Sequence, residues 1–204
     1  NGGKHAILTT FMSLLNPGDE VLIPSPYWTT YPEAVKISGG NPVIVDTEFD
    51  DDFKINTDQL EALKTNKTKI LVWVSPSNPT GVVYTKEEAE KIYNWAFDND
   101  IWILSDELYE HLVYEGVTSP SPAQYDKTLK NTIVINGVAK AYSMTGWRMG
   151  WSVWPEKLIP HVTKLAINSF SCVNAPSQFA GIAALDGPDD SIHHMMEKFD
   201  QRRK

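Results

Sequence analysis

The chain has little cysteine and no long apolar run. Among its 204 residues Cys172 is the single cysteine, so no internal disulfide can form. This scarcity suits a reducing compartment, and we expect a cytoplasmic protein. No apolar stretch approaches the ~20 residues that are needed to cross a bilayer, so we expect no membrane association.

Positive charge and metal-binding patterns are also scarce. The formal net charge of −8 argues against nucleic acid as a partner. The acidic residues cluster in segments 47–53 and 186–190, which are typical of solvated loops. His193 and His194 are adjacent, so on a helix they point about 100° apart and suit no shared metal ion. We therefore expect neither nucleic-acid binding nor metal catalysis.

The composition is that of a globular protein, with 42% hydrophobic and 22% charged residues. The length fits one large domain, or one domain with part of another. The chain opens in a glycine turn that leads into a helical pattern. It ends inside another helical pattern, without the glycine or proline that usually stops a helix. We therefore expect a piece of a longer protein.

Short apolar runs alternate with longer amphipathic segments. Strands are predicted in residues 20–26, 41–46, 69–81, 101–111, 131–137 and 147–154, the third and fourth continuing into loops. Helices are predicted in residues 4–15, 27–40, 56–64, 85–100 and 155–167. Asn56 or Thr57 is the expected N-cap of the third helix, and Thr85 and Glu88 have the spacing of a capping box. The alternation predicts an α/β fold, a three-layer α/β/α sandwich with a mostly parallel sheet.

Polar residues follow three of the predicted strands. Asn78 comes after one strand, Asp106 and Tyr109 after the next, and Lys140 after a third. In open α/β sheets, ligands bind just beyond the carboxyl ends of the strands. We therefore expect these four residues to converge at one edge of the sheet.

The segment "NGVAKAYSMTGWRMG", residues 136–150, suggests their chemistry. A lysine that acts as a nucleophile must lose a proton, and nearby cations and desolvation favour this loss. Arg148 offers a guanidinium fork for phosphate, and the helix that follows Gly2–Gly3 offers free N–H groups for an anion. Together with Asp106 as a buried acid, Lys140 then suits pyridoxal phosphate. The "GGKHA" segment lacks the spacing of a P-loop, and no dinucleotide-binding fingerprint follows a strand.

Five motifs follow one another along the chain: "NGGKHAI", "SPYWTTYPE", "SPSNPTGVVY", "SDELYEHLVYEG" and "AKAYSMTGWRMG". With them the sequence resembles the fold-type I pyridoxal-phosphate enzymes, specifically class I aminotransferases of the bacterial aspartate aminotransferase type (subgroup Ib). The motifs are spread over residues 1–150 of the chain. The resemblance also implies candidate cis peptides at Ser25–Pro26 and Asn78–Pro79.

The resemblance implies roles for four residues around the cofactor ring. Lys140 would form the internal aldimine with pyridoxal phosphate and later move the proton between the substrate Cα and the cofactor C4′. Asp106 would pair with the protonated pyridine nitrogen. Tyr109 and Asn78 would hydrogen-bond the phenolic oxygen of the ring.

Further residues are implied for the ring face and the phosphate. Trp28 would stack on the ring. Arg148 would hold the phosphate together with the backbone N–H groups of Gly3 and Lys4. Many relatives carry a serine directly before the lysine, whereas this chain has Ala139, which removes a phosphate hydrogen bond worth about 1–2 kcal/mol.

The resemblance also implies a domain division and an activity. Residues 1–175 would form the pyridoxal-phosphate-binding large domain without its first strand, and residues 176–204 would begin the long helix that leads to a small domain. The full-length protein would be a homodimer that transfers an amino group from an aspartate-like amino acid to a 2-oxo acid such as 2-oxoglutarate. Two alternatives stay open: another fold-type I reaction such as a C–S lyase, and a catalytically silent scaffold.

Overall fold

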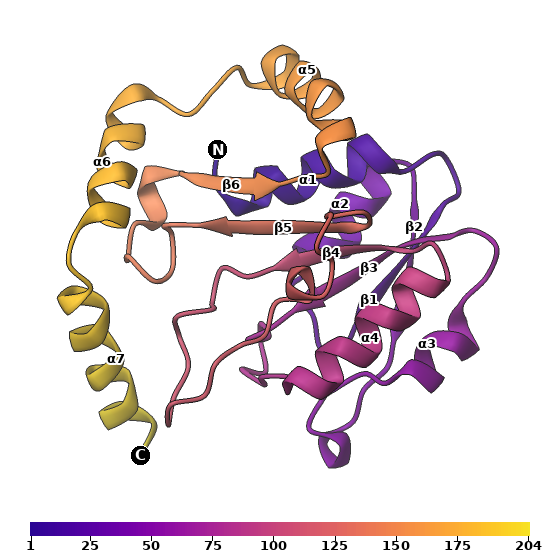
Figure 1. Cartoon of the computed structure of the whole chain (residues 1–204), viewed down its shortest axis with the longest axis horizontal. Helices are drawn as coiled ribbons and strands as arrows, with labels where there is room; N and C mark the ends of the chain where they lie inside the picture. Colours follow the sequence, from indigo (N-terminus) through magenta and orange to yellow (C-terminus); the bar gives the residue numbers. More distant parts are fainter.

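The computed structural model describes residues 1–204 and contains one six-stranded sheet (Figure 1). The strands are β1 (Glu20–Pro24), β2 (Asn41–Val45), β3 (Thr68–Val74), β4 (Trp102–Asp106), β5 (Thr132–Gly137) and β6 (Gly150–Val153). Their order across the sheet is β2-β1-β3-β4-β5-β6, and all neighbours are parallel except the antiparallel pair β5–β6. The six predicted strands all form, and the prediction of a mostly parallel sheet is confirmed.

Five helices correspond to the five predicted helical segments. They are α1 (Gly3–Leu14), α2 (Thr30–Ile37), α3 (Thr57–Leu63), α4 (Lys86–Asp98) and α5 (Ile159–Ser169). Short 3-10 turns are η1 (Phe49–Asp51), η2 (Pro122–Gln124), η3 (Thr145–Trp147) and η4 (Glu156–Leu158). Asn56 is the N-cap of α3, and Thr85 and Glu88 form the predicted capping box at the start of α4.

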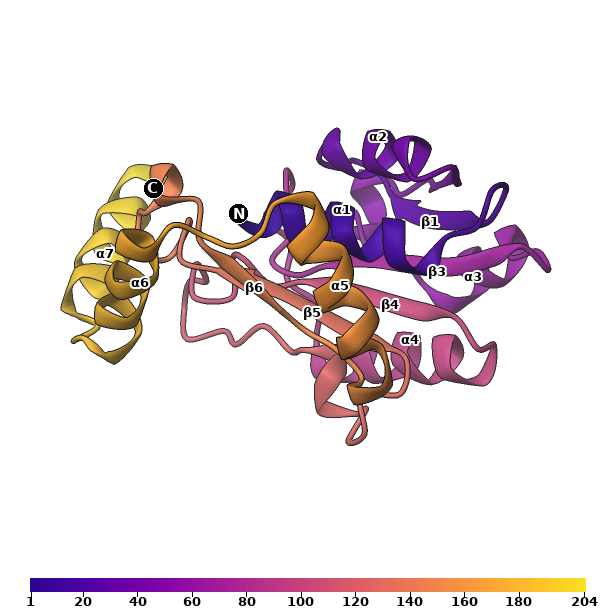
Figure 2. The ribbon, with the colours of Figure 1, turned by 90° about the horizontal axis from the view of Figure 1, so that it is seen from above.

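Apolar side chains pack on both faces of the sheet. Along β1, Val21 and Ile23 belong to the core shared with α1 and α2, whereas Leu22 belongs to the core shared with α3 and α4. Figure 2 shows α1 and α2 on one side of the strands and α4 on the other. All three β1 side chains are fully buried, and each contributes about 1.5–3 kcal/mol through removal from water. The predicted three-layer sandwich is confirmed.

The C-terminal residues lie at one side of the sheet as two helices, α6 (Ala175–Asp186) and α7 (Asp190–Arg203) (Figures 1 and 2). The long helix that we expected over residues 176–204 is therefore not continuous. Pro188 has no N–H and disfavours helical backbone in the residue before it, so Gly187 is extended and α6 ends. The assignment of this segment to a domain boundary stays a prediction. None of the helices is both long and apolar enough to span a bilayer.

A glycine contact brings the start of α1 against β6. A Cβ atom added to Gly150 would lie 2.9 Å from the backbone nitrogen of Gly3 and 3.0 Å from the carbonyl carbon of Gly2. Because backbone occupies that space, a side chain at Gly150 would force the two segments apart. The contact therefore sets the first turn of α1 beside the segment that carries Arg148.

We expect Thr85→Ala to lower the free energy of unfolding by about 1 kcal/mol, because α4 loses the hydroxyl that accepts from the Glu88 N–H. Urea unfolding followed by circular dichroism measures this change. Thr128→Ala, at an exposed loop position, is the control and should alter the free energy by less than ~0.5 kcal/mol. Equal losses in the two variants would contradict the capping role.

Candidate active site

A cavity of about 110 Å³ lies at the carboxyl edge of the sheet. Asp106, the last residue of β4, contributes to its wall, as does Lys140, which follows β5. The cavity is lined by Gly3, Lys4, Ile7, Trp28, Tyr31, Asn78, Asp106, Leu108, Tyr109 and Lys140. Arg148 is the one predicted site residue that is not among them. The structure thus brings the other seven predicted residues together.

Asp106 is a buried carboxylate whose charge is only partly stabilised by its neighbours. Only 4% of the residue is exposed. The Tyr31 hydroxyl donates to Oδ2 at 2.7 Å, and the Leu108 backbone N–H donates to Oδ1 at 3.3 Å. Burial raises the pKa of Asp106, while these two hydrogen bonds and the charge of Lys140 oppose the rise. A cation bound beside Asp106 would offset the remaining cost of burying its charge.

Tyr31 is the residue at this site that the sequence analysis missed. Burial, and then the nearby Asp106 carboxylate, raise the pKa of Tyr31 well above its ordinary value, so the hydroxyl stays protonated and donates. The Tyr31 ring also meets Trp28 edge-on, with ring centroids 5.6 Å apart and planes at 87°. The available signal was the three-residue spacing of Trp28 and Tyr31 within the predicted helix 27–40, which would put both rings on one side.

Lys140, Tyr109 and Asn78 are neighbours in the cavity. The Lys140 Nζ lies 5.5 Å from the centroid of the Tyr109 ring. The Asn78 Nδ2 donates to the Tyr109 hydroxyl over a long 3.4 Å. An amine, a phenol and a carboxamide therefore share the cavity with the Asp106 carboxylate. Such a set can bind a small polar ring and present a lysine nucleophile to it.

The two predicted anion-binding elements adjoin each other. Helix α1 begins at Gly3 with no side-chain cap and no acidic residue in its first turn, so its first N–H groups are free for an anion. The Arg148 guanidinium lies beside this turn, since a Cβ atom on Gly2 would lie 2.7 Å from its Nη2. Arg148 is exposed, and its Nη1 donates to the Thr145 carbonyl at 2.9 Å. Gly3 lines the cavity, so this anion site borders it.

Lys4 adds a side chain where the sequence predicted only a backbone role. Its Nζ lies 5.0 Å from the centroid of the Trp28 ring. A cation over an indole face is worth about 0.5–1 kcal/mol at an exposed site. The contact holds Trp28 between Lys4 and the edge of Tyr31, and so fixes one wall of the cavity.

Comparison with known families identifies the family of this chain. The model of the family described as "Aminotransferase class I and II" matches residues 1–204, which is the whole chain. The chain belongs to this family. The fold and the order of the five motifs are thus those of an aminotransferase.

The chain is also similar in sequence and in structure to individual aminotransferases. An aspartate aminotransferase of Streptomyces avermitilis is 47% identical over 100% of this chain and 50% of its own length. One of Bacillus sp. (strain YM-2) is 48% identical over 98% of this chain and 52% of its own length. The crystal structure of an aromatic aminotransferase from Pyrococcus horikoshii OT3 has a TM-score of 0.95 and 36% identity, over 99% of this chain and 55% of that one. The chain spans about half the length of the curated relatives it matches.

The chain has cis peptides at both predicted positions, Ser25–Pro26 and Asn78–Pro79. A third cis peptide, Ser75–Pro76, was not predicted. The first follows β1 and the other two follow β3. All three therefore lie in the loops that carry Trp28 and Asn78 to the cavity.

We expect Tyr31→Phe to lower the free energy of unfolding at neutral pH by about 1–3 kcal/mol, because the buried Asp106 carboxylate loses a donor. The loss should shrink in acid, where the carboxyl is protonated. Chemical denaturation at both pH values measures it. Tyr93→Phe is the matched control, since the Tyr93 ring is buried and its hydroxyl makes no hydrogen bond within the chain. A Tyr31→Phe loss no larger than that of Tyr93→Phe would contradict this role.

We expect Asp106→Asn to be more stable than the wild type at neutral pH in the ligand-free chain. Burial raises the folded-state pKa of Asp106 above its unfolded value, so the folded chain binds the proton more tightly. Wild-type stability therefore falls as the pH rises from the unfolded pKa through the folded pKa. Asparagine stays neutral and removes this fall, so the advantage should vanish in acid. Melting temperatures between about pH 3 and pH 8 measure it, and parallel curves would contradict it.

Proposed function

We propose that the chain is the cofactor-binding part of a pyridoxal-phosphate-dependent aminotransferase. The reaction transfers an amino group from an aspartate-like amino acid to a 2-oxo acid such as 2-oxoglutarate. One observation carries the proposal: the Lys140 amine shares a cavity with the buried Asp106 carboxylate, and an anion site borders that cavity. A nucleophilic amine, an acid and a phosphate grip are what this cofactor requires of a protein.

Residues of the cavity fit the cofactor ring. Asp106 Oδ1 has one long backbone contact, so a protonated pyridine nitrogen would supply the cation that this buried carboxylate needs. Asn78 and Tyr109 would bind the phenolic oxygen, because both carry donors at the cavity wall. Trp28 would lie against a face of the ring.

Residues at the border of the cavity fit the phosphate. Arg148 and the backbone N–H groups of Gly3 and Lys4 would hold it. The glycines support this assignment, because a Cβ atom on Gly3 would lie 2.8 Å from the Leu108 side chain. A side chain at Gly3 would require the Leu108 side chain, which lines the same cavity, to move.

Different residues of the chain would then transfer, hold and orient protons in the reaction. When bound, pyridoxal phosphate supplies a carbon that takes the amino group and a ring that draws electrons from the substrate Cα. Lys140 Nζ would take the proton from the substrate Cα and give it to the carbon that bears the amino group. Asp106, where ionised, would hold a proton on the ring nitrogen. Tyr31 opposes the rise in the Asp106 pKa and orients the carboxylate, because its own raised pKa leaves its hydroxyl protonated and able to donate.

The assignment of substrate rests on relatives. The curated relatives named above are aspartate aminotransferases, which supports an aspartate-like donor. The structure from Pyrococcus horikoshii is of an aromatic aminotransferase, so an aromatic amino acid is the matched competitor in an assay. A ratio of kcat/KM values that favours the aromatic donor would overturn the choice of aspartate.

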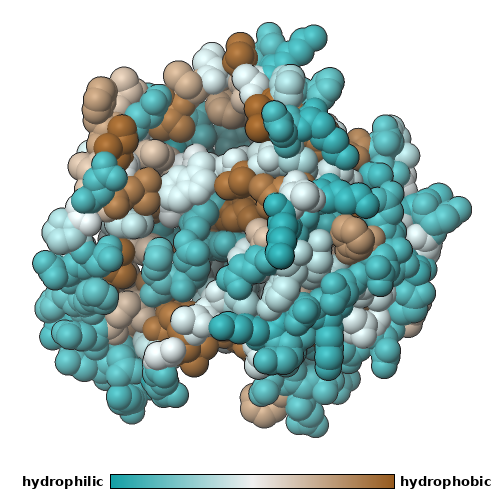
Figure 3. All heavy atoms as spheres, in the orientation of Figure 1, coloured by the Kyte–Doolittle hydropathy of each residue, from teal (hydrophilic) through white to brown (hydrophobic).

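We also propose that residues 1–175 form the cofactor domain of a longer, cytoplasmic, homodimeric protein, and that residues 176–204 lead to its second domain. Relatives twice as long support the greater length. Exposed apolar side chains on α6 support a partner surface: Phe179 is 73% exposed and Ile182 53%. Figure 3 shows apolar atoms gathered at the upper left, where α6 lies.

The test of the cofactor site is the visible absorption spectrum of the protein mixed with pyridoxal phosphate. We expect a band in the wild type that Lys140→Ala lacks, and borohydride should fix the cofactor onto Lys140. Lys67→Ala removes an exposed lysine and should keep the band. The experiment uses the longest form that the gene encodes beside the 204-residue chain. Absence of a Lys140-dependent band from both forms would overturn the proposal.

The same proteins separate the remaining activities. Amino transfer from aspartate to 2-oxoglutarate would support the aminotransferase. Release of pyruvate from a cysteine thioether, without amino transfer, would instead show a C–S lyase. A Lys140-dependent band with neither reaction in the longest form would show a cofactor-binding scaffold.

A further inference from the structure

Asn78 and Tyr109 lie on two separate loops whose spacing their own contact cannot set. Asn78 is in the connection from β3 to α4, and Tyr109 follows β4. Their hydrogen bond is long, at 3.4 Å, and therefore weak. A stronger constraint must fix the distance between the two loops if both side chains are to serve one atom of a ligand.

That constraint begins where the loops leave the sheet. Val74 of β3 is paired with Asp106 of β4, so Ser75 and Glu107 are the first residues beyond two adjacent strand ends. Both are buried, with 2% and 8% of each residue exposed. Each of them is bonded to a serine of one short segment farther along the chain.

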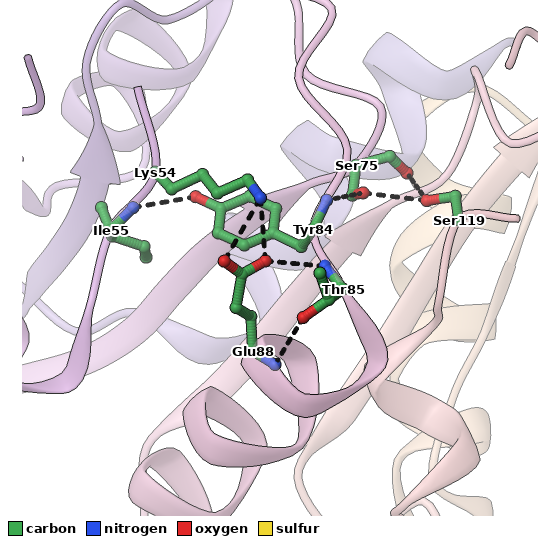
Figure 4. A network of polar contacts seen from close by, with 7 residues as sticks. All are labelled: Lys54, Ile55, Ser75, Tyr84, Thr85, Glu88 and Ser119. Carbon is green, nitrogen blue, oxygen red and sulfur yellow. Dashed lines mark hydrogen bonds and ion pairs between the residues drawn. The ribbon is translucent and has the colours of Figure 1, made fainter. Parts of the chain in front are cut away.

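This segment, Ser119–Ser121, is called the serine clip below. The Ser119 Oγ donates to the Ser75 carbonyl at 2.9 Å and is 2.8 Å from the Ser75 Oγ (Figure 4). The Ser121 Oγ donates to the Glu107 Oε1 at 2.5 Å. The Ser105 Oγ donates to the same carboxylate oxygen at 2.7 Å. The clip therefore joins the start of the Asn78 loop to the start of the Tyr109 loop.

The protons of the Ser119–Ser75 contact are all assigned by this geometry. Each hydroxyl carries one proton. Ser119 gives its proton to the Ser75 carbonyl, so the Ser75 hydroxyl must give its own to the Ser119 Oγ. The Ser75 Oγ also accepts from the Tyr84 N–H at 3.3 Å. Removal of the Ser119 hydroxyl, as in Ser119→Ala, would therefore break two hydrogen bonds together.

The clip is stiff and well anchored. Pro120 and Pro122 are buried, and proline fixes the backbone angle φ. Ser121 also accepts from the Ala123 N–H at the start of η2. A segment of this kind can hold two loops in place with little motion of its own.

The far end of the Asn78 loop has additional anchors outside the clip. Tyr84 accepts from the Ile55 N–H at 3.1 Å, and the ion pair of Lys54 with Glu88 lies beside it (Figure 4). Burial raises the pKa of Tyr84 to about 12, so it remains a neutral hydroxyl. With Tyr84 held at one end and Ser75 at the other, Asn78 lies on a loop that is anchored on both sides.

We propose that the serine clip is a positioning device that sets the spacing of Asn78 and Tyr109, and through it the hydrogen bonding of the phenolic oxygen of the cofactor. This inference rests on the proposed function. Neither Ser119 nor Ser121 lines the cavity, so they act through the two loops. Their effect should appear in the protonation of the bound cofactor and in kcat, with little change in KM.

The test compares Ser119→Ala and the double variant Ser119→Ala/Ser121→Ala with the wild type, each in its longest form and loaded with pyridoxal phosphate. We expect a shifted midpoint in the pH titration of the visible band. The kcat should fall roughly 10- to 100-fold while KM changes less than about threefold. Ser119→Thr keeps the hydroxyl and should restore the wild-type values. Ser13→Ala, an exposed serine of α1, should change neither quantity.

A double-mutant cycle separates positioning from general destabilisation. If the clip sets the spacing of Asn78 and Tyr109, the midpoint shift of Ser119→Ala should vanish in an Asn78→Ala/Tyr109→Phe background, whereas a merely structural role gives additive effects. Folded clip variants with an unmoved midpoint and unchanged kcat would overturn the inference alone. Should the alanine variants not fold, a midpoint shift in Ser119→Cys sustains the inference and its absence overturns it. A wild type without a Lys140-dependent band would overturn the proposed function and this inference with it.

Discussion

The burial of one carboxylate is the constraint on which this site depends. Asp106 ends a parallel strand, so its side chain lies inside the protein, where water no longer solvates its charge. The Tyr31 hydroxyl, the Leu108 amide and the Lys140 charge compensate in part. Each acts strongly because the helices around it keep the local dielectric low. The ligand-free fold thus carries an electrostatic cost that a cationic ring nitrogen would relieve.

The parallel topology supplies both the site and its support. Five strands run in the same direction, so their carboxyl ends meet at one edge of the sheet. Residues that end a strand or closely follow one, such as Asp106 and Lys140, reach the cavity from that edge. The first residues beyond β3 and β4, Ser75 and Glu107, lie at the same edge and receive the serine clip. The residues of the cavity and the residues that position them are therefore both placed by the parallel order of the strands.

The sequence predicts what is local or follows from the parallel rule. The box of Thr85 and Glu88 needs only a three-residue spacing, and the gathering of strand-end residues needs only a parallel sheet. The bond between Tyr31 and Asp106 joins positions 75 apart, and such a side-chain pair leaves no periodic mark. The break at Gly187–Pro188 is different, because Gly-Pro is a local turn signal that outweighed the helical pattern around it.

The backbone contact between Gly3 and Gly150 links formation of the anion site to the folding of the chain. The two parts of the anion site, the start of α1 and the segment with Arg148, are far apart in the sequence. Strands β1 to β5 lie between them along the chain, so they meet only when most of the sheet has formed. Closing so long a loop costs entropy before any contact rewards it, so we expect this corner of the molecule to assemble late. A phosphate-bearing ligand that binds only the finished corner would draw the folding equilibrium toward completion by mass action. Cofactor supply would then govern how much of the protein is folded.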